Sequence, residues 1–377
     1  MKTDDFKETS ARLGNISRRD FMRYCSIMAG ALGLSTGLAP RIAQAIADPK
    51  RRPPVIWLHG QECTGCTETL LRPSHPSLDS LILDLISLDY HETLCAGAGQ
   101  QAEASLAQSM RDNAGKYVLV IEGAIPVKEN GIYCKIAGKT FLSLVEEVAA
   151  QAGAIIAIGS CAAWGGIPSA HPNPTGATSA PEVLKGKTVV TIPGCPPNPY
   201  NFLSTVVHFL TFGKLPKLDS LGRPTFAYGR LIHENCERRP HFDAGRFAEK
   251  FGDEGHRLGY CLYKLGCKGP VTHANCPEIQ FNDLGGGTWP VGTGHPCFGC
   301  AEKGVGFTIP MFTQVEVLSP TPFAMQAPIT PERPVPVSPL TAGLAGGALG
   351  LVIGASAVAL RKLKDTPDDP DHPVKED

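Results

Sequence analysis

Short runs of apolar residues recur through the first half of the chain and predict buried strands. The runs occupy residues 55–58, 117–121, 154–158 and 188–192, and stretches with helical character lie between them. A further apolar segment covers residues 81–88. Uninterrupted apolar strands that alternate with helices are typical of a parallel sheet buried on both faces. The pattern therefore predicts an α/β fold with a doubly wound parallel sheet.

Cysteines follow three of these four runs closely. Cys63 and Cys66 come after the first run, Cys161 after the third and Cys195 after the fourth. Because ligands of open α/β sheets bind at the carboxyl ends of the strands, the four thiols can converge on one edge. Neighbouring glycines permit a close approach of the backbone to a bulky ligand. We interpret the four as ligands of one shared metal cluster; a thioredoxin-like Cys-x-x-Cys pair and two disulfides are the alternatives.

Residues 228–306 have a weak apolar periodicity and are rich in Gly, Pro, His and Cys. Seven candidate metal ligands lie within them: His233, Cys236, Cys261, Cys267, Cys276, Cys297 and Cys300. The spacing suggests a set of four, which ends at Cys267, and a set of three. Such a segment has little core of its own, and metal sites can stabilise it. Zinc and iron–sulfur clusters both fit this spacing, and a disulfide framework is a third alternative. For His233 the alternative to metal ligation is a surface histidine beside three thiols.

The N-terminal segment has the layout of an export signal. An arginine pair at residues 18–19 precedes a weakly apolar stretch at residues 27–39 and small-x-small sites at residues 43–47. This arrangement resembles the twin-arginine signal, which directs the export of proteins that are already folded. We therefore predict a signal peptide over residues 1–47, outside the mature fold. An amphipathic surface helix is the alternative.

The other end of the chain contains an uncharged stretch. Residues 340–360 include no charged side chain, and as a helix they would span about 30 Å, the thickness of a bilayer core. Basic residues follow at once in the tail, residues 361–377, and the positive-inside rule places this tail in the cytoplasm. A Pro-rich linker, residues 319–339, precedes the stretch. We predict a C-terminal transmembrane helix, and a buried helix of a soluble domain is the alternative.

Composition narrows the classes of protein further. Of the 377 residues, 42% are hydrophobic, which is enough for a packed core and argues against general disorder. The net charge is −1, so electrostatics gives no reason to expect a nucleic acid as the main partner. Thirteen cysteines are more than a cytosolic enzyme usually has, and too few for a small disulfide scaffold. Metal ligation fits this intermediate number.

Four motifs resemble a known family. They are Cys63-Thr64-Gly65-Cys66-Thr67-Glu68, Gly159-Ser160-Cys161, Pro193-Gly194-Cys195-Pro196-Pro197-Asn198-Pro199 and Gly294-His295-Pro296-Cys297-Phe298-Gly299-Cys300. In this order they resemble the small subunit of membrane-bound, uptake-type [NiFe] hydrogenases, and residues 226–255 look most like the hydrogenase-2 kind. The resemblance extends over nearly the whole chain. It implies a flavodoxin-like domain at residues 48–225 and an iron–sulfur domain at residues 226–318.

The resemblance also implies three clusters and their ligands. Cys63, Cys66, Cys161 and Cys195 match the ligands of a proximal [4Fe–4S] cluster. His233, Cys236, Cys261 and Cys267 match those of a distal [4Fe–4S] cluster. Cys276, Cys297 and Cys300 match those of a medial [3Fe–4S] cluster, with Pro290 at its vacant fourth-ligand position. Oxygen-tolerant members carry two extra cysteines near the proximal cluster, where this chain has Gly65 and Gly166, so we expect an oxygen-sensitive enzyme.

The resemblance implies a role for the chain as well. The chain would conduct single electrons from a Ni–Fe centre held by a separate large subunit, and it would contain no catalytic residues itself. Electrons would pass from the proximal to the medial and distal clusters, and His233 would lie toward the surface where they leave. A cytochrome b-type or other quinone-reducing membrane subunit, often with another iron–sulfur protein, would accept them at the periplasmic side of the inner membrane. Two other classes stay open: a membrane-tethered protein with only structural zinc or disulfide sites, and a protein like the iron–sulfur subunits of complex I.

Overall fold

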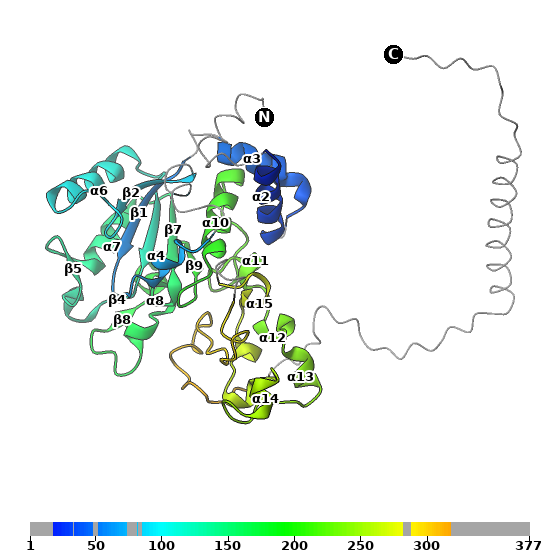
Figure 1. The fold of residues 1–377 in the computed structure, drawn as a ribbon. Coiled ribbons are helices and arrows are strands. Elements are labelled where there is room, and N and C mark those ends of the chain that lie inside the picture. Colours follow the sequence, from blue (N-terminus) through cyan, green and yellow to red (C-terminus); the bar gives the residue numbers. More distant parts are fainter. Residues whose placement is uncertain are drawn as a thin grey trace, which may run out of the picture. The chain divides into compact units, whose positions relative to one another are not determined.

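Five parallel strands form the central sheet of the computed structural model, which describes residues 18–32, 34–47, 52–73, 81, 85–281 and 288–317. The strands are β1 (Pro54–His59), β2 (Ser87–His91), β3 (Val118–Glu122), β7 (Ala154–Ile158) and β9 (Val189–Ile192). They lie in the order β2-β1-β3-β7-β9, and every neighbouring pair is parallel (Figure 1). This is the strand order of flavodoxin-like doubly wound sheets. The predicted α/β fold with a parallel sheet is therefore confirmed.

Alternate strand residues build two separate cores, one on each face of the sheet. The covering helices are α10 (Pro199–Phe212) on one face and α6 (Gln100–Asp112) and α7 (Phe141–Ala150) on the other. Trp57 and Val120 belong to the core under α10, whereas Ile56 and Leu119 belong to the core under α6 and α7. Each fully buried side chain of this kind stabilises the fold by roughly 1.5–3 kcal/mol. Because both faces are covered, the strands read as uninterrupted apolar runs.

Shorter elements connect these strands and helices. They are α4 (Gly65–Thr69), β4 (Ile125–Pro126), η4 (Lys128–Gly131), β5 (Lys135–Ile136), β6 (Lys139–Thr140), α8 (Gly159–Trp164), η5 (Ile167–Ser169), β8 (Ala177–Thr178) and α9 (Ala180–Val183). Helix α8 begins directly after β7, and α4 follows β1 after a short turn. Both helices therefore start at the carboxyl edge of the sheet, where α/β proteins place their ligands.

The described part of the N-terminal segment packs on the layer that contains α10. It consists of α2 (Arg18–Ala31), η1 (Thr36–Leu38) and α3 (Ala39–Ala47), and α3 contacts α10 (Figure 1). Phe21, Cys25 and Ile42 are fully buried, and Arg41 lies over the ring of Phe212. In the uncleaved chain, the apolar side chains of the described residues therefore extend the core, and the place of this segment outside the mature fold stays a prediction. The export role of residues 1–47 stays a prediction.

Residues 225–281 and 288–317 fold with short helices and loops, as their weak periodicity predicts. The helices are α11 (Thr225–Tyr228), α12 (Ile232–Asn235), α13 (Arg239–Asp243), α14 (Glu254–Arg257), η6 (Tyr263–Leu265), η7 (Gly269–Val271) and α15 (Cys276–Ile279). Strand pairing among these residues is limited to isolated bridges, such as the one between Phe247 and Cys261. The region lies beyond the same end of the sheet as α4 and α8 (Figure 1). Since secondary structure is sparse here, side-chain contacts must hold the loops.

The predicted membrane segment cannot be compared with the fold. Within the described ranges, no helix is long and apolar enough to cross a membrane. The linker (319–339), the transmembrane helix (340–360) and the tail (361–377) that the sequence predicts all lie outside those ranges. These three segments stay predictions.

Candidate metal centres

The carboxyl edge of the sheet brings together Cys63, Cys66, Cys161 and Cys195, which we call the edge group. Cys63 lies in the turn after β1, Cys66 in α4, Cys161 in α8 and Cys195 after β9. Burial raises the pKa of the Cys66 thiol well above its usual value, and the charges of Glu122 and of the other three cysteines raise it further. Burial and the charge of Cys195 raise the pKa of Cys161 to about 12. Thiolates this crowded become favourable when a bound metal neutralises them.

Two glycines border the edge group closely. A Cβ added at Gly65 would lie 3.1 Å from Cys63 Sγ, and one added at Gly166 would lie 2.7 Å from Cys161 Sγ. Gly166 also has a φ of +51°, a conformation that residues with a side chain rarely adopt. These are the two positions at which we expect oxygen-tolerant relatives to carry extra cysteines. The structure places both beside edge-group thiols.

Glu122, the last residue of β3, is a site residue that the sequence pattern did not reveal. Its side chain is 1% exposed and accepts four hydrogen bonds. The donors are Cys66 N at 3.0 Å, Thr67 N at 3.2 Å, Thr67 Oγ1 at 2.6 Å and Trp57 Nε1 at 3.0 Å. Because two of these donors are backbone N–H groups of α4, Glu122 fixes the helix that carries Cys66. An acidic residue at the end of an apolar strand is the signal that could have identified it.

Glu122 also belongs to a set of potential ion ligands. One ligand atom each from His59, Glu62 and Glu122 lies within 4.8 Å of the others. However, the four hydrogen bonds to Glu122 already occupy the acceptor positions of its carboxylate. Burial raises the pKa of Glu62, and the charge of Glu122 raises it further. We therefore interpret these residues as a buried polar network beside the edge group.

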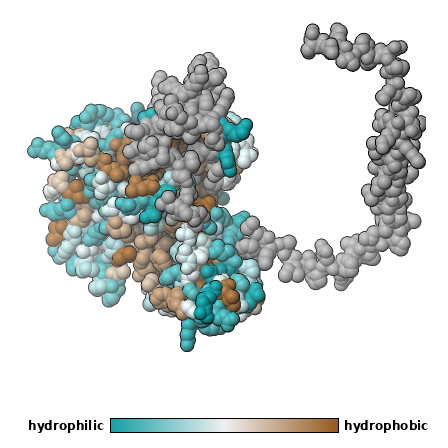
Figure 2. Space-filling view, viewed as in Figure 1, coloured by the Kyte–Doolittle hydropathy of each residue, from teal (hydrophilic) through white to brown (hydrophobic). Residues whose placement is uncertain are grey.

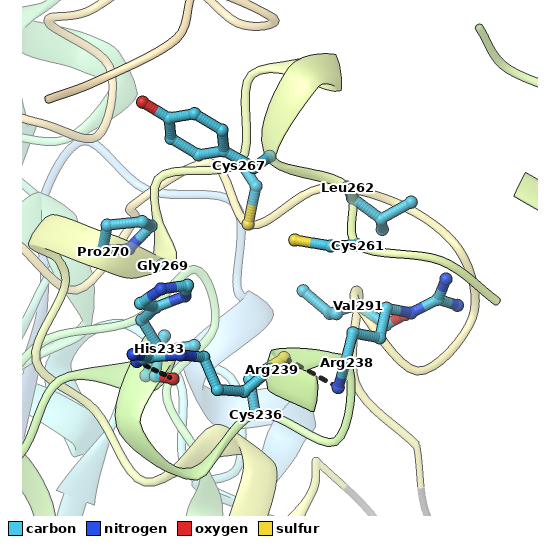
Figure 3. Close-up of a pocket in the computed structure, with 12 residues that line it drawn as sticks. His233, Cys236, Arg238, Arg239, Cys261, Leu262, Cys267, Gly269, Pro270 and Val291 are labelled. Carbon is cyan, nitrogen blue, oxygen red and sulfur yellow. Dashed lines mark hydrogen bonds between the residues drawn. The ribbon is translucent and has the colours of Figure 1, made fainter. Parts of the chain in front are cut away.

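A cavity in the C-terminal region is lined by His233, Cys236, Cys261 and Cys267, which we call the cavity group. His233 belongs to α12 and Cys236 follows this helix, whereas Cys261 and Cys267 lie on either side of η6. Figure 3 shows the sulfur atoms of Cys261 and Cys267 and the imidazole of His233 facing one space. The pocket between them is partly open to solvent. Four ligand side chains around one pocket could hold a bound metal group.

His233 is buried, with an exposure of 7%. The alternative of a surface histidine is therefore wrong, whereas the expectation that this residue lies on the side where electrons leave stays a prediction. Its Nε2 atom is buried and has no hydrogen-bond partner in the described part of the chain. Burial, followed by the charge of Arg239, lowers the pKa of His233 to about 4, so the ring is neutral at pH 7. A neutral imidazole with an unused buried nitrogen suits metal ligation.

Arg238 holds the loops around this cavity. Its guanidinium donates hydrogen bonds to the carbonyl oxygens of Val291 at 3.0 Å and Tyr260 at 2.9 Å. Its backbone N–H donates to Cys236 Sγ at 3.4 Å (Figure 3). These contacts join three loops that are far apart in the sequence. In this region the hydrogen bonds of Arg238 hold the ligand segments together, as strand pairing does at the edge group.

Cys276, Cys297 and Cys300 form the third set, which we call the middle group. Cys276 begins α15, and the other two lie in the last described loop segment. The pKa of each thiol is raised, mainly by burial. The charges of Cys300 and Cys276 also raise the pKa of Cys297, and that of Cys300 raises the pKa of Cys276. The three thiols therefore lie within electrostatic reach of one another.

Contacts on one side connect the middle group to the edge group. The charge of Cys195 raises the pKa of Cys300, while a hydrogen bond from the Cys195 backbone opposes this. Ser160 Oγ donates to Cys300 O at 2.6 Å and accepts from Gly194 N at 3.0 Å. Ser160 thus ties the segments that carry Cys161, Cys195 and Cys300 to one another.

Contacts on the other side connect the middle group to the cavity group. The charge of Cys267 contributes to the raised pKa of Cys297. Lys268, the next residue, donates its backbone N–H to Cys297 O at 2.6 Å. The three groups therefore form a row in the order edge, middle, cavity. This order differs from the order in the sequence, where the middle-group cysteines come last.

Ligand spacing distinguishes single ions from clusters. Zinc binds thiolates at about 2.3 Å, so the ligand atoms of a tetrahedral site lie within about 4 Å of one another. Among the residues that the structure describes, no three cysteine or histidine ligand atoms lie within 4.8 Å of one another. All thirteen cysteines are described and all are unpaired, which contradicts the disulfide alternatives. The described thiols are therefore spaced more widely than the ligands of a single tetrahedral zinc ion.

Three residues of interest lie outside these groups. Pro290 lies in a turn, and its carbonyl accepts a hydrogen bond from His295 N at 2.9 Å. Cys95 Sγ donates to His91 O at 2.6 Å, and Cys134 is partly buried. The two cysteines join none of the three groups. The place of Pro290 at the middle group stays a prediction.

The chain has a flavodoxin-like sheet followed by a cysteine-rich region, and the three thiol groups extend from one to the other. These features together define the class of iron–sulfur electron-transfer subunits. Residues 63–209 match the family of the NADH ubiquinone oxidoreductase 20 Kd subunit, and residues 228–313 match the C-terminal family of NiFe/NiFeSe hydrogenase small subunits. The chain is 55% identical to the hydrogenase-2 small chain of Escherichia coli strain K12, over 92% of this chain and 93% of that one. The chain belongs to the family of [NiFe] hydrogenase small subunits.

Other relatives agree with this membership. The periplasmic [NiFe] hydrogenase small subunit of Solidesulfovibrio fructosivorans is 49% identical, over 79% of this chain and 93% of that one. A chain of the recombinant [NiFeSe] hydrogenase from Desulfovibrio vulgaris Hildenborough matches with a TM-score of 0.62 and 41% identity, over 67% of this chain and 93% of that one. The resemblance that the four motifs indicate is confirmed.

Family membership establishes the class of activity. The protein is the electron-transfer subunit of a hydrogenase and works as a heterodimer with the large subunit. Small subunits of this family carry iron–sulfur clusters. The alternative of a structural zinc or disulfide protein without redox activity is not supported. The likeness to complex I is limited to the sheet domain, because the second half matches the hydrogenase family.

Proposed function

We propose that the row of thiol groups holds three clusters of different types. The edge group would hold the proximal [4Fe–4S] cluster and the cavity group the distal [4Fe–4S] cluster. The middle group would hold the medial [3Fe–4S] cluster, with Pro290 where a fourth ligand would be. The spatial order edge, middle, cavity is the observation that carries this proposal, because an electron relay requires successive neighbours. When bound, the clusters supply one-electron redox chemistry.

The residues of this chain prepare the three positions. Glu122 fixes the start of α4 beneath Cys66, and Ser160 ties the edge group to the middle group. Arg238 joins the loops around the cavity group, and His233 offers a neutral nitrogen that has no other described partner. We assign no catalytic residue to this chain, because the cleavage of H₂ would take place at the Ni–Fe centre of the large subunit.

Exposed apolar residues support docking of the large subunit at the edge group. Leu71 follows α4, Ile132 and Tyr133 follow β4, and Ile167 follows α8, so all four lie in segments that leave the carboxyl edge of the sheet. Each is at least 42% exposed. Figure 2 shows apolar residues at several places on the visible face of the molecule. Exposed apolar residues on segments that leave one edge of a sheet suit a protein interface, and this interface would place the partner's metal centre beside the first cluster of the row.

The location of the complex follows from the two ends of the chain. Residues 1–47 would act as a twin-arginine signal that exports the folded, cluster-loaded subunit. Residues 340–360 would anchor it in the inner membrane with the main domain in the periplasm. A cytochrome b-type or other quinone-reducing subunit, with or without another iron–sulfur protein, would then accept electrons from the distal cluster. The periplasmic [NiFe] hydrogenase of Solidesulfovibrio fructosivorans supports the compartment.

Metal analysis and EPR of the heterodimer purified from native membranes test the cluster assignment. We expect about twelve iron atoms per heterodimer, about eleven of them in the clusters of this chain and one in the Ni–Fe centre, with about twelve acid-labile sulfides and about one spin of oxidised three-iron cluster. Cys236→Ser should change the signal of a four-iron cluster and leave the three-iron signal in place. The matched control Cys134→Ser, outside the three groups, should change neither signal. Zinc without labile sulfide in the wild-type protein would refute the proposal.

A further inference from the structure

Lys268 is a buried charged residue that the roles assigned above leave without a function. Its side chain is fully buried, with an exposure of 0%. The Nζ atom donates hydrogen bonds to the carbonyl oxygens of Gly266 at 3.3 Å, Pro310 at 3.1 Å and Thr313 at 3.5 Å. Lysine is rarely buried so completely, because its charge loses the solvation of water. Such a position requires negative charge nearby.

Other buried cations of the chain have carboxylate partners. Arg223 is 4% exposed and pairs with Asp219 at 2.7 Å and Glu302 at 3.0 Å. Arg239 is 3% exposed and pairs with Asp243 at 2.8 Å. For Lys268, the partners found among the described residues are carbonyl oxygens, which carry only partial charges. Something other than a carboxylate must therefore balance the ammonium.

The groups beside Lys268 that would become anionic on metal binding are the candidate ligand thiols. Lys268 directly follows Cys267 of the cavity group, and its backbone N–H donates to Cys297 O of the middle group at 2.6 Å. A Cβ added at Gly299, between Cys297 and Cys300, would lie 3.3 Å from the Lys268 side chain. Lys268 thus lies between the two ligand groups, and its backbone and the stem of its side chain contact the loop of the middle group.

We propose that Lys268 is a positioning residue whose fixed positive charge balances the metal cluster bound by the middle group and raises its reduction potential. The proposal rests on the medial [3Fe–4S] assignment made above. Reduction adds negative charge to a cluster, and a nearby cation in a medium of low dielectric constant favours the more negative state. The three carbonyl contacts hold the ammonium in place, so its charge does not move away when the cluster changes oxidation state.

EPR-monitored redox titration of the purified heterodimer tests this role. The variants are Lys268→Gln, which keeps hydrogen-bond donors without the charge, Lys268→Met, which keeps the apolar stem, and Lys268→Arg, which keeps the charge. At a fixed solution potential near the midpoint, we expect the neutral variants to shift the ratio of reduced to oxidised three-iron cluster about tenfold toward the oxidised form. This corresponds to a lowering of the midpoint by about 59 mV for a one-electron couple.

A control and a conservative variant sharpen the comparison. Lys264→Gln removes a lysine charge at a site that is 41% exposed and paired with Glu249, so we expect its three-iron midpoint to equal that of the wild type. Lys268→Arg keeps the charge, so its three-iron midpoint should lie close to that of the wild type. The proximal four-iron midpoint should change less than the medial one in every variant, because the edge group lies at the other end of the row.

Each outcome separates this inference from the cluster assignment. A wild-type protein without a three-iron signal would refute the assignment itself. An intact signal with an unchanged midpoint in Lys268→Gln or Lys268→Met would refute the role of Lys268. Loss of the signal in both neutral variants, with retention in Lys268→Arg, would support charge balance as a condition for cluster assembly. Loss in all three variants, with the proximal signal preserved, would show that the charge is not the decisive property and would overturn the proposal.

Discussion

The edge group and the cavity group place four ligands each, but by different physical means. At the edge group, each cysteine follows a strand of a sheet that has an apolar core on both faces. At the cavity group, the ligands lie on loops and one-turn helices that Arg238 joins through backbone carbonyls. The sheet does not need a metal to bury its core, whereas the loops of the cavity group surround a pocket that is partly open to solvent. The edge group is positioned by its scaffold, whereas a metal bound by the cavity group would stabilise the loops that surround it.

Removal of iron should produce the largest difference between the two regions. We expect amide protection in residues 226–281 and 288–317 to fall at least about a thousandfold, equivalent to about 4 kcal/mol of local stability. Strands β1, β3 and β7 should keep their protection, because their cores remain. Hydrogen-exchange mass spectrometry on the protein before and after chelation measures both regions at once. An equal loss in both regions would contradict the comparison.

A substitution that creates a cavity in the sheet core should destabilise the sheet domain before the C-terminal region. Leu119, in the centre of β3, is fully buried, and Leu119→Ala should lower the free energy of unfolding of the sheet domain by about 2–5 kcal/mol. Leu258→Ala is the matched control, because Leu258 is 56% exposed in the C-terminal region; we expect a cost of less than about 0.5 kcal/mol. Hydrogen exchange of β1, β3 and β7 in the heterodimer provides the measurement. Equal effects of the two substitutions would show that the sheet core does not carry this stability.

Glu302 allows a smaller, pH-dependent test of how side chains hold the C-terminal loops. It accepts hydrogen bonds from Arg223 and His273, both at 3.0 Å. Burial raises the pKa of Glu302, but the hydrogen bonds from His273 and the charge of Arg223 outweigh it, so the pKa lies below its usual value. A lowered pKa contributes stability above the unfolded value of about 4.3, and this contribution disappears as the pH falls through the folded pKa.

Glu302→Gln should therefore destabilise the C-terminal region at pH 7 by about 1–3 kcal/mol, and the difference from the wild type should shrink below about pH 4. Unfolding measured at pH 7 and at successively lower pH provides the comparison. Glu182→Gln removes a carboxylate that is 52% exposed and pairs with Lys303 at 3.4 Å, and it should cost less than about 1 kcal/mol at either pH. A constant difference between Glu302→Gln and the wild type over this range would show that ionisation of Glu302 does not stabilise the fold.

The sheet could be predicted because burial on both faces leaves a direct trace in the sequence. The run at residues 154–158 became β7 with the same bounds, and the convergence of Cys161 and Cys195 follows from a general property of parallel sheets. The packing of Phe21 and Cys25 on the α10 layer could not be predicted in this way. A segment with the features of a signal peptide and a segment that covers an apolar face have the same amphipathic character.

The side chains that support the ligands were harder to predict than the ligands themselves. Cysteines are recognisable by type and spacing, whereas Arg238 and Lys268 bind backbone carbonyls of distant loops, and a carbonyl leaves no trace in the sequence. The burial of His233 was missed for a related reason, because its position depends on the packing of loops without periodicity. The order of the three groups in space also depends on tertiary contacts, such as that of Ser160 with Cys300.

The position of the middle group has a consequence for how the protein is made. A ribosome synthesises Cys63 through Cys267, and with them every ligand of the two outer groups, before it reaches Cys297 and Cys300. A chain that ends before residue 297 would contain the complete edge group and cavity group but would lack two of the three cysteines of the middle group between them. Under the proposed cluster assignment, an electron path through all three groups would therefore be complete only when nearly the whole domain has been translated.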